Sequence, residues 1–402
     1  MKILFDATEL SYYNDNDGHK AGVFYVALNL FKEFKKMGVD LTFVCDFRRY
    51  YFLKNIKEFE NIALLEENSF LNRLWGKLIY KTRNFPIRIK YAILILARFY
   101  DAFFYKCNKG NSEQLKGFDV YFSPYTPPSK EIQDSEIKKF RMLHDAIPIM
   151  ENGCPKSPKD WYYKIYNSIN DKDFYVTNSD YTKKDILKYF PNLDENNIKT
   201  TLLGANENFC VSKKPSPIEG KYVFSLCTLG KRKNLEFVIR NFFDFIKNRD
   251  IKDLKLVLGG SVWHKYKKEL SKILEKYDKS KIILSGYINE EELSSYYSNA
   301  LCFVYPSLYE GFGLPVLEAM SCGCPVITSE TSSLPEVIGD TGIKINPKND
   351  KEMIEALERM YYDNIFRALC SERGLERAKE FSWEKCAKEI TDFITSKNTP
   401  IK

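Results

Sequence analysis

The chain has 402 residues, 44% of them hydrophobic, and a formal net charge of +7. This length exceeds the size at which one core usually stops growing, so we expect two domains, and the hydrophobic content is ample for globular folding. Ten cysteines at irregular spacing are typical of reduced core residues, because Cys322 and Cys324 lack the two-residue spacer of metal and redox pairs.

The N-terminal run MKILFDATEL is short, contains Asp6 and Glu9, and has no small-residue cleavage site. It predicts a first β-strand and not a signal peptide, so we expect a cytoplasmic protein. Asp6 and Glu9 would border the ligand cleft where this strand ends, and either could be an ordinary loop residue. The next loop contains Asp15 and Asp17, a spacing that can bind one hard cation. We interpret this pair as solvated, because it lies in a polar loop and not at a strand end.

Residues 70–107 combine aromatic and aliphatic side chains with many Lys and Arg and few acids. The longest apolar piece, YAILILARFYDAFFY, is interrupted by Arg98 and Asp101 and is too short to span a bilayer. The pattern fits peripheral contact with an anionic inner membrane face or a lipid-linked substrate. It also fits helices that pack on the domain with a solvated basic face. No nucleic-acid-binding motif is present, so nucleic acid is not an expected partner.

His144 is one of three histidines and directly follows the strand-like run FRML. The carboxyl end of a strand is where functional groups gather in parallel α/β folds, so we interpret His144 as functional. The neighbouring Asp145 either orients the His144 ring or caps the turn.

Both halves of the chain alternate strand-like runs with amphipathic helical stretches, which predicts two doubly wound α/β domains of Rossmann type. The join falls near residues 210–220, where Pro and Lys accumulate and the periodicity ends. We therefore expect an N-terminal domain at 1–210, a C-terminal domain at 211–381, and a helix at 382–402 that could pack back on the first domain. Ligands of such folds bind in the cleft at the carboxyl ends of the strands.

Two loops of the second half follow predicted strands. Lys231, Arg232 and Lys233 lie just before a helix start, a combination that suits a diphosphate, although such a loop is by itself also typical of an ordinary basic surface. Gly286 and Tyr287 follow the run KIILS, where backbone groups and a ring could face a nucleotide base.

The stretch CFVYPSLYEGFGLPVLEAM predicts a strand, a glycine turn and a helix with Pro315 in its first turn. The backbone N–H groups of residues 311–314 would suit phosphates. Glu310 and Glu318 flank this turn, and a carboxylate accepts paired hydrogen bonds from a vicinal diol. We predict that the two glutamates hold the two sugars of a sugar nucleotide. A solvated glutamate near a helix start explains each residue separately, but not the set.

EGFGLPVLE resembles the paired-glutamate motif of the retaining glycosyltransferases of family 4, which have the GT-B fold. Other stretches resemble further parts of that family in the same order, namely RKNLEFVI, MLHDAIPI, VTNSDYTKKDI and FSWEKCAKEI. The resemblance covers nearly the whole chain and is most specific over residues 222–349.

This resemblance implies that the domain at 1–210 binds the acceptor and the domain at 211–381 binds the nucleotide sugar. It also implies that Glu310 and His144 are the catalytic residues beside the donor sugar and that Glu318 holds the ribose. The other donor-binding residues that it implies are Gly22, Arg232, Lys233, Phe312, Gly313 and Leu314. Gly286 and Tyr287 join the predicted donor site because of their position after a strand. Gly22 would let the backbone approach the phosphates or the acceptor. Many family members have an arginine at the position of Thr228, so here Arg232 must take over or the phosphate site is weaker.

The implied reaction is a retaining, metal-independent transfer of a hexose from a nucleotide-diphosphate sugar to a glycan or lipid-linked hydroxyl, with no cofactor, in surface polysaccharide or lipopolysaccharide biosynthesis. The stretches SLPE and RKN are similar to those of the family branch that often uses GDP-mannose-like donors. A UDP-sugar is the alternative donor. The alternatives are a sugar-nucleotide epimerase of this fold and a non-catalytic binding protein. A phosphorylase is disfavoured because no pyridoxal lysine is evident, and a nicotinamide dehydrogenase because no Gly-x-Gly-x-x-Gly follows the first strand.

Overall fold

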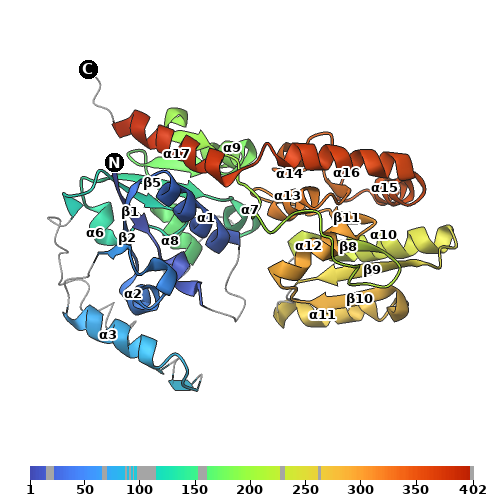
Figure 1. Cartoon of the computed structure of the whole chain (residues 1–402), viewed down its shortest axis with the longest axis horizontal. Coiled ribbons are helices and arrows are strands. Elements are labelled where there is room, and N and C mark those ends of the chain that lie inside the picture. The colour runs from blue at the N-terminus through green and yellow to red at the C-terminus, as the bar shows by residue number, and fades with distance from the viewer. Residues whose placement is uncertain are drawn as a thin grey trace.

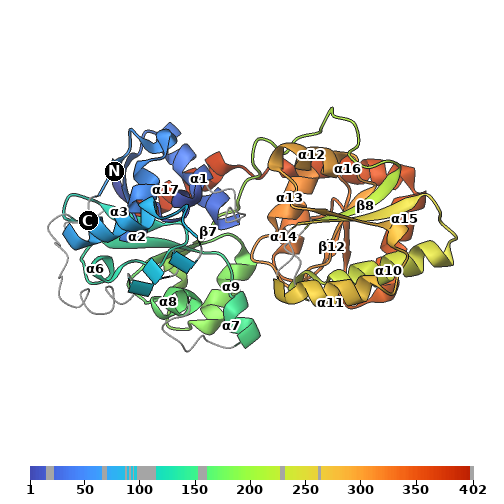
Figure 2. The ribbon, with the colours of Figure 1, turned by 90° about the horizontal axis from the view of Figure 1, so that it is seen from below.

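The computed structural model describes residues 1–14, 22–65, 70–86, 88–89, 92–93, 95–96, 115–152, 161–226, 231–260 and 264–398. These residues form two parallel sheets with helices on their faces, one built from each half of the chain (Figures 1 and 2). We call the part on the first sheet the N-terminal domain and the part on the second sheet the C-terminal domain. The predicted pair of doubly wound α/β domains is confirmed.

The N-terminal sheet has seven strands in the order β3-β2-β1-β4-β5-β6-β7. Its central strands are almost fully buried apolar runs, as expected where helices cover both faces. The chain order reverses between β1 and β4, so this is the switch point of the sheet. The strands are β1 (Lys2–Asp6), β2 (Asp40–Val44), β3 (Ala63–Leu64), β4 (Val120–Ser123), β5 (Lys138–Leu143), β6 (Phe174–Thr177) and β7 (Ile198–Thr200).

The helices of the N-terminal domain follow the apolar periodicity of their sequences. In the first helix, Phe24, Ala27, Phe31 and Phe34 recur at helical spacing and are buried. The helices are α1 (Gly22–Lys36), α2 (Phe47–Lys54), α3 (Phe70–Lys81), α6 (Lys130–Gln133), α7 (Ile147–Asn152), α8 (Trp161–Asn167) and α9 (Asp180–Tyr189), with short 3-10 turns η1 (Glu9–Tyr12), η2 (Lys57–Phe59) and η3 (Glu195–Asn197).

The C-terminal sheet has six strands in the order β10-β9-β8-β11-β12-β13, with its switch point between β8 and β11. Its strands are β8 (Lys221–Leu226), β9 (Leu254–Gly259), β10 (Ile282–Gly286), β11 (Cys302–Tyr305), β12 (Val326–Ser329) and β13 (Ile343–Ile345). Its helices are α10 (Leu235–Asn248), α11 (His264–Leu274), α12 (Glu290–Ser298), α13 (Leu314–Ser321), α14 (Leu334–Ile338), α15 (Asp350–Tyr362) and α16 (Asn364–Ala378), with 3-10 turns η4 (Lys231–Lys233) and η5 (Lys279–Lys281).

The last helix, α17 (Trp383–Asn398), leaves the C-terminal domain and lies along the N-terminal one (Figure 1). The Phe393 ring is 5.7 Å from that of Phe140 and 6.2 Å from that of Phe174, both in the first sheet. At the crossing, a Cβ on Gly204 would lie 2.5 Å from the backbone nitrogen of Trp383, so the connecting segment needs glycine there. Within the described residues, no helix is both long and apolar enough to cross a membrane.

Candidate functional site

The glycine turn after β11 lies at the switch point of the C-terminal sheet. Gly313 has φ 109° and is the N-cap of α13, and a Cβ there would lie 2.6 Å from the Leu334 side chain. Ser333 Oγ donates to the carbonyl oxygens of Glu310 and Phe312, at 3.0 and 2.8 Å, which fixes the turn. The turn therefore presents the N-terminus of α13 in a fixed conformation, and such termini favour anions.

Glu310 lies at the centre of this site and is 8% exposed. Its Oε1 accepts from Lys233 Nζ at 2.6 Å, Ser307 Oγ at 2.6 Å and Tyr305 OH at 3.0 Å, and Arg232 Nη1 is 2.8 Å away. Burial alone would raise the pKa of Glu310, but the charges of Lys233 and Arg232 outweigh it and lower the pKa to about 2. Glu310 is therefore ionised and holds both cations in place.

The two cations come from η4, the turn between β8 and α10. Arg232 also donates to the carbonyl oxygen of Tyr309. Burial disfavours its charge, but Glu310 outweighs this and raises the pKa of Arg232. The following residue, Asn234, has φ 58° and caps α10, while its side-chain amide donates to the carbonyl oxygens of Pro306 and Pro347 at 3.2 and 2.7 Å. The basic loop predicted from sequence is thus fixed against the glutamate turn.

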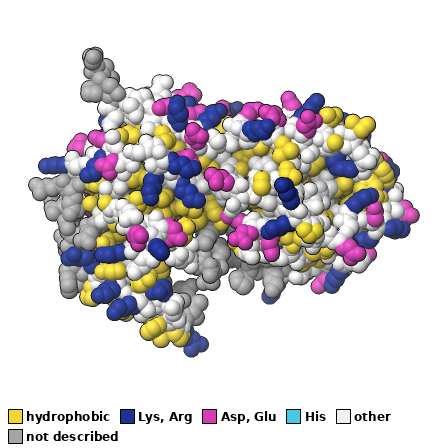
Figure 3. Space-filling view, in the orientation of Figure 1, with side chains coloured by type: hydrophobic (Ala, Val, Ile, Leu, Met, Phe, Trp, Pro, Cys, Tyr) yellow, Lys and Arg dark blue, Asp and Glu magenta, His cyan; other side chains and the backbone are white. Residues whose placement is uncertain are grey.

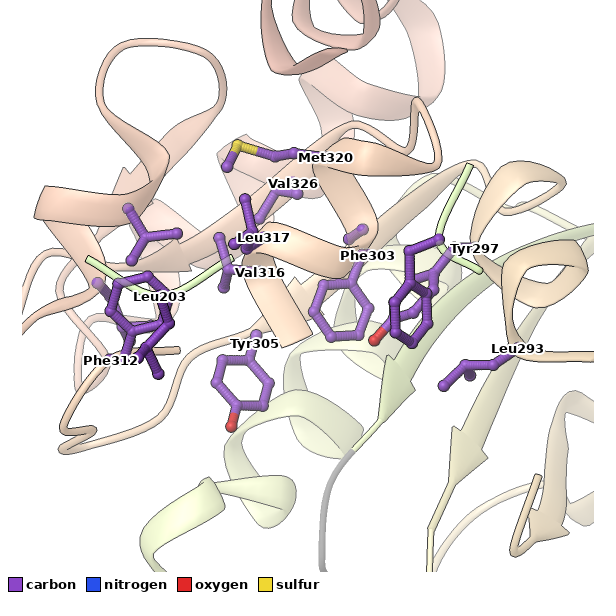
Figure 4. Close-up of a cluster of buried hydrophobic side chains, with 14 of the residues drawn as sticks. Leu203, Leu293, Tyr297, Phe303, Tyr305, Phe312, Val316, Leu317, Met320 and Val326 are labelled. Atoms are coloured by element: carbon purple, nitrogen blue, oxygen red, sulfur yellow. The ribbon is translucent and has the colours of Figure 1, made fainter. Parts of the chain in front are cut away.

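Glu318 lies on α13 in the opposite electrostatic environment. Burial raises the pKa of Glu318 to about 8, and the nearby charge of Glu290 adds to this shift. Tyr297 OH donates a hydrogen bond to Oε2 at 3.1 Å, which partly opposes the shift. Tyr25 of α1 contacts Glu290, whose charge contributes, after burial, to raising the pKa of Tyr25. Figure 4 shows the apolar cluster that supports this region, with Tyr297, Phe303 and Tyr305 beside α13.

Gly286 and Tyr287 lie at the end of β10. Gly286 has φ 67°, and its carbonyl oxygen accepts from Gly260 N at 2.7 Å. The Tyr287 side chain is 62% exposed. Its phenol is close enough to Tyr25 to contribute to the raised pKa of that residue. The ring is therefore exposed on the side of the domain that α1 approaches.

His144 stands at the end of β5 in the N-terminal domain. Its Nε2 lies 2.6 Å from the carbonyl oxygen of Pro124, and because a carbonyl only accepts, this nitrogen carries the proton. Burial lowers the pKa of His144, which favours the neutral ring. Asp145 caps the turn, since its Oδ1 accepts from Ile147 N at 2.9 Å. Burial raises the pKa of Asp145 to about 6, against the opposing effects of the Ile147 bond and of the charge of Arg232 across the domain junction.

The glycine turn contacts the N-terminal domain directly. A Cβ on Gly311 would lie 1.9 Å from the carbonyl oxygen of His144, so only glycine fits. The carbonyl oxygen of Gly311 accepts from Ser179 Oγ at 2.7 Å and from Thr182 Oγ1 at 3.0 Å. Tyr309 OH donates to Asp185 Oδ2 at 2.5 Å. The donor-side loop and the α9 region therefore form one continuous polar contact.

Of the remaining residues singled out from the sequence, Gly22 and Phe312 lie in the described part of the chain and three others do not. A Cβ on Gly22 would lie 3.8 Å from Leu314 Cδ1, so the start of α1 is near the start of α13, but that distance leaves room for a side chain. Phe312 is buried against Phe381, with ring centroids 6.1 Å apart, which leaves its backbone as the part able to face a ligand. Asp15, Asp17 and Thr228 fall outside the described residues.

Sequence reasoning missed four polar groups that complete the site: Tyr305, Ser307, Tyr309 and Glu336. The first two donate to Glu310, and the last accepts from the backbone nitrogens of Asp180 and Tyr181 at 2.9 and 2.7 Å. Their only sequence signal is position, since Tyr305 ends β11 and the other three lie in a loop or helix start after a strand of the C-terminal sheet. In the described part of the chain, no group of three or more His, Cys, Asp or Glu side chains could hold a metal ion.

Residues 206–377 match the model of the family described as glycosyl transferases group 1, and this segment contains the glutamate turn and the basic loop. This part of the chain is therefore similar to the group 1 glycosyl transferases. Over 250 residues, 58% of the chain, it is 33% identical to the O-antigen chain mannosyltransferase B of Escherichia coli. The alignment covers 64% of that relative, and the chain spans less than two thirds of the length of the first curated relatives that it matches.

Solved structures of the same fold match nearly the whole chain. Sucrose-phosphate synthase from Thermosynechococcus elongatus superposes with a TM-score of 0.68 at 16% identity and covers 98% of each chain. Anabaena HepE in complex with UDP superposes with a TM-score of 0.69 at 14% identity, over 98% of this chain and all of that one. At these identities the likeness shows the fold alone, and the GT-B prediction is confirmed.

Proposed function

We propose that this protein is a retaining, metal-independent glycosyltransferase that moves a hexose from a nucleotide-diphosphate sugar to a hydroxyl of a glycan or lipid-linked acceptor. The observation that carries the proposal is the convergence of Arg232, Lys233 and Glu310 on the N-terminus of α13, at the switch point of the C-terminal sheet. Cations and a helix N-terminus suit a diphosphate, and carboxyl groups suit sugar hydroxyls.

The donor site follows from this geometry. The diphosphate would lie at the backbone N–H groups of α13 and bind Arg232 and Lys233, which also contact Glu310. These fixed positive charges would stabilise the negative charge that develops on the leaving group. Glu310 would accept from donor-sugar hydroxyls, and Glu318, with its raised pKa, could both donate to and accept from the ribose diol. Tyr287 would stack on the base, because its ring is exposed.

His144 would orient the donor sugar from the N-terminal domain. Its protonated Nε2 is held by Pro124, which leaves Nδ1 of the neutral ring as a hydrogen-bond acceptor. In the mechanism we propose, the acceptor hydroxyl attacks on the face that the diphosphate leaves, and a phosphate oxygen takes its proton. No enzyme carboxylate then acts as the nucleophile, in agreement with a Glu310 that is occupied by two cations.

The names of relatives favour a mannosyl donor and an acceptor in O-antigen or lipopolysaccharide biosynthesis. The E. coli relative is described as an O-antigen chain mannosyltransferase, which makes a GDP-mannose-like donor our first expectation. The HepE structure contains UDP, which keeps a UDP-sugar as the second. An epimerase of the same fold would release product without an acceptor and is distinguished by that requirement.

Thermal unfolding with a panel of GDP-, UDP-, ADP- and CMP-sugars, in EDTA, tests the donor site. A ligand at a hundred times its Kd stabilises the folded state by about 2.7 kcal/mol, so the matching nucleotide should raise the unfolding midpoint clearly. Glu318→Ala should remove most of the shift, whereas the same substitution at Glu358, a partly exposed glutamate on α15, should retain it. A shift that appears only after a divalent ion is added would contradict the metal-independent site.

We also propose that α3 contacts an anionic membrane surface. The helix contains no acidic residue, Leu74 and Leu78 are 53% and 40% exposed, and Lys77 and Lys81 are exposed beside them. Its opposite side packs on α2, with the Tyr80 and Phe52 rings 5.2 Å apart. Figure 3 shows basic and hydrophobic side chains together in the region where Figure 1 places α3. An apolar face flanked by lysines fits anionic headgroups.

Co-sedimentation with phosphatidylglycerol vesicles tests this surface. At about 1 kcal/mol per lysine near the membrane, the double variant Lys77→Glu/Lys81→Glu should bind at least ~10-fold more weakly. The matched variant Lys272→Glu/Lys276→Glu, with the same spacing and both lysines exposed, should bind like the wild type. Equal loss in both variants, or none in either, would refute a role of α3.

A further inference from the structure

The chain passes between the two domains twice, first from β7 to β8 and then from α16 to α17 (Figure 1). The two passages touch, because Gly204 of the first lies against the backbone of Trp383 in the second. The first passage starts fastened to the N-terminal sheet, where Thr201 N donates to the carbonyl oxygen of Thr177 at 2.9 Å. A rotation of the domains against each other would therefore bend the first passage beyond Thr201.

From Asn208 onward, the first passage is fastened to α12 of the C-terminal domain. Ser294 Oγ donates to the carbonyl oxygen of Asn208 at 2.5 Å, and Ser298 Oγ accepts from Ser212 N at 2.9 Å. Residues 202–207, between the two anchors, are thus the segment in which the chain changes domain. A few loop residues that absorb a change of backbone angles are the usual form of a hinge.

Asn206 lies inside this segment, and its side-chain amide bonds to both domains. Its Oδ1 accepts from Asn29 Nδ2 of α1 at 2.6 Å. Its Nδ2 donates to Glu290 Oε1, at the start of α12, at 3.4 Å. The Asn29 amide is itself oriented, because its Nδ2 also donates to the carbonyl oxygen of Tyr25 at 2.9 Å. A rotation of either domain would distort one of these bonds, and hydrogen bonds weaken steeply when they are distorted.

The two helices that this amide joins both border the proposed donor site. Tyr297 on α12 donates to Oε2 of Glu318, the glutamate assigned to the ribose, at 3.1 Å. The first residue of α1, Gly22, lies near Leu314 at the start of α13. The bridge is therefore adjacent to the donor site, and its amide is not one of the groups assigned to the donor.

We propose that Asn206 is a positioning residue, a two-sided latch between Asn29 and Glu290 that sets the angle between the domains. The proposed reacting groups come from both domains, His144 from one and Glu310 from the other, so this angle sets their separation. A misplacement of about 1 Å in an active site can cost about 100-fold in rate. The effect of the latch on sugar transfer rests on the proposed function, whereas its effect on the domain angle does not.

Small-angle X-ray scattering of the full-length protein without ligand, at mildly alkaline pH, tests the latch. In Asn206→Asp, the new carboxylate still accepts from Asn29 but repels Glu290, so the radius of gyration should increase. Adding Glu290→Gln supplies an amide donor from the other side, so the double variant Asn206→Asp/Glu290→Gln should return to the wild-type value. The control Asn299→Asp alters an exposed amide that bonds to Ser295 within α12, and should scatter like the wild type.

Steady-state kinetics with the nucleotide sugar selected by the donor panel measure the consequence for transfer. In Asn206→Asp, kcat should fall at least ~10-fold and recover in the double variant. The KM for the nucleotide sugar should change little in Asn206→Asp, because the donor-binding groups are unaltered.

Equal scattering of Asn206→Asp and the wild type, or an expansion that Glu290→Gln does not reverse, would overturn the latch. An expanded Asn206→Asp protein with the kcat of the wild type would overturn the positioning role. Reversible expansion together with no sugar transfer by the wild type would confirm the latch and contradict the proposed function.

Discussion

At the scale of single residues, two glutamates eight positions apart have opposite electrostatic environments. Glu310 is surrounded by two cations and two hydroxyl donors, and its pKa is lowered to about 2. Glu318 receives one hydrogen bond, from Tyr297, and burial raises its pKa to about 8. The first is a fixed anion that positions Arg232 and Lys233. The second is protonated at neutral pH, which suits a group that exchanges hydrogen bonds with a diol.

Glu310→Gln should destabilise the protein, because it leaves two partly buried cations without their counter-charge. The side chains of Glu310 and Lys233 are 11% and 13% exposed, and removing one partner of a buried ion pair typically costs about 3–5 kcal/mol. Urea unfolding at pH 7 measures this loss. Glu358→Gln, which breaks the exposed pair with Arg249, should change stability by about 0–1 kcal/mol. A Glu310→Gln protein as stable as this control would disprove the proposed charge balance.

The pH dependence follows from the sign of the Glu310 shift. A carboxyl group whose pKa is lowered on folding contributes stability above its ordinary value of 4.5 and loses it as the pH falls toward about 2. The difference between the wild type and Glu310→Gln should therefore shrink as the pH is lowered from 4.5.

At the scale of elements, four hydrogen bonds join the start of α9 to the glycine turn and to α14 of the C-terminal domain. Ser179 and Thr182 donate to the Gly311 carbonyl, and Glu336 accepts from the first backbone amides of α9. Carboxylates are favoured at a helix N-terminus, so Glu336 caps α9 from the other domain. Since Glu310 precedes Gly311, these contacts also fix the position of Glu310 relative to His144.

The substitution Gly311→Ala should separate the glycine turn from the start of α9. The new Cβ would lie 1.9 Å from the His144 carbonyl oxygen, a backbone atom that cannot move alone. Amide hydrogen exchange should show Asp180 and Tyr181 exchanging at least ~10-fold faster, because their bonds to Glu336 open. In the control Gly117→Ala, whose Cβ meets nothing within 4 Å, the exchange of these amides should not change. Unchanged protection in Gly311→Ala would show that the contact tolerates a side chain.

At the scale of the whole molecule, the proposed active site is assembled from both domains. The C-terminal domain supplies the proposed donor-binding groups after β8, β10 and β11, and the N-terminal domain supplies His144 after β5. Asn29 of α1 donates to Asn206 Oδ1 at 2.6 Å, and α17 packs on the first sheet, so further contacts hold the parts together. Neither domain alone would contain a complete site.

The sequence predicts the elements that carry strong local patterns. Apolar runs mark the central strands, and the glycine turn with Pro315 marks the start of α13, so Glu310, Arg232, Lys233 and His144 can be assigned to strand ends before the structure is known. The strands β3 and β7 have only two and three residues, too few for a period-2 pattern.

Contacts between the domains could not be predicted from local patterns. The hydrogen bond from Tyr309 to Asp185 and that from Ser179 to Gly311 join residues more than a hundred positions apart. The ion pairs of Glu310 with Arg232 and Lys233 also depend on three-dimensional packing. No periodicity or motif specifies such a distance, so these groups emerge only from the folded arrangement.

The most direct test of the central claim is the fate of each nucleotide sugar in EDTA, followed by NMR with a lipid-linked or oligosaccharide acceptor. We predict release of the nucleoside diphosphate together with a new glycosidic bond that has the anomeric configuration of the donor, and at least ~100-fold less product with Glu310→Gln. A product of inverted configuration, product formation without any acceptor, or full activity of Glu310→Gln would contradict the account.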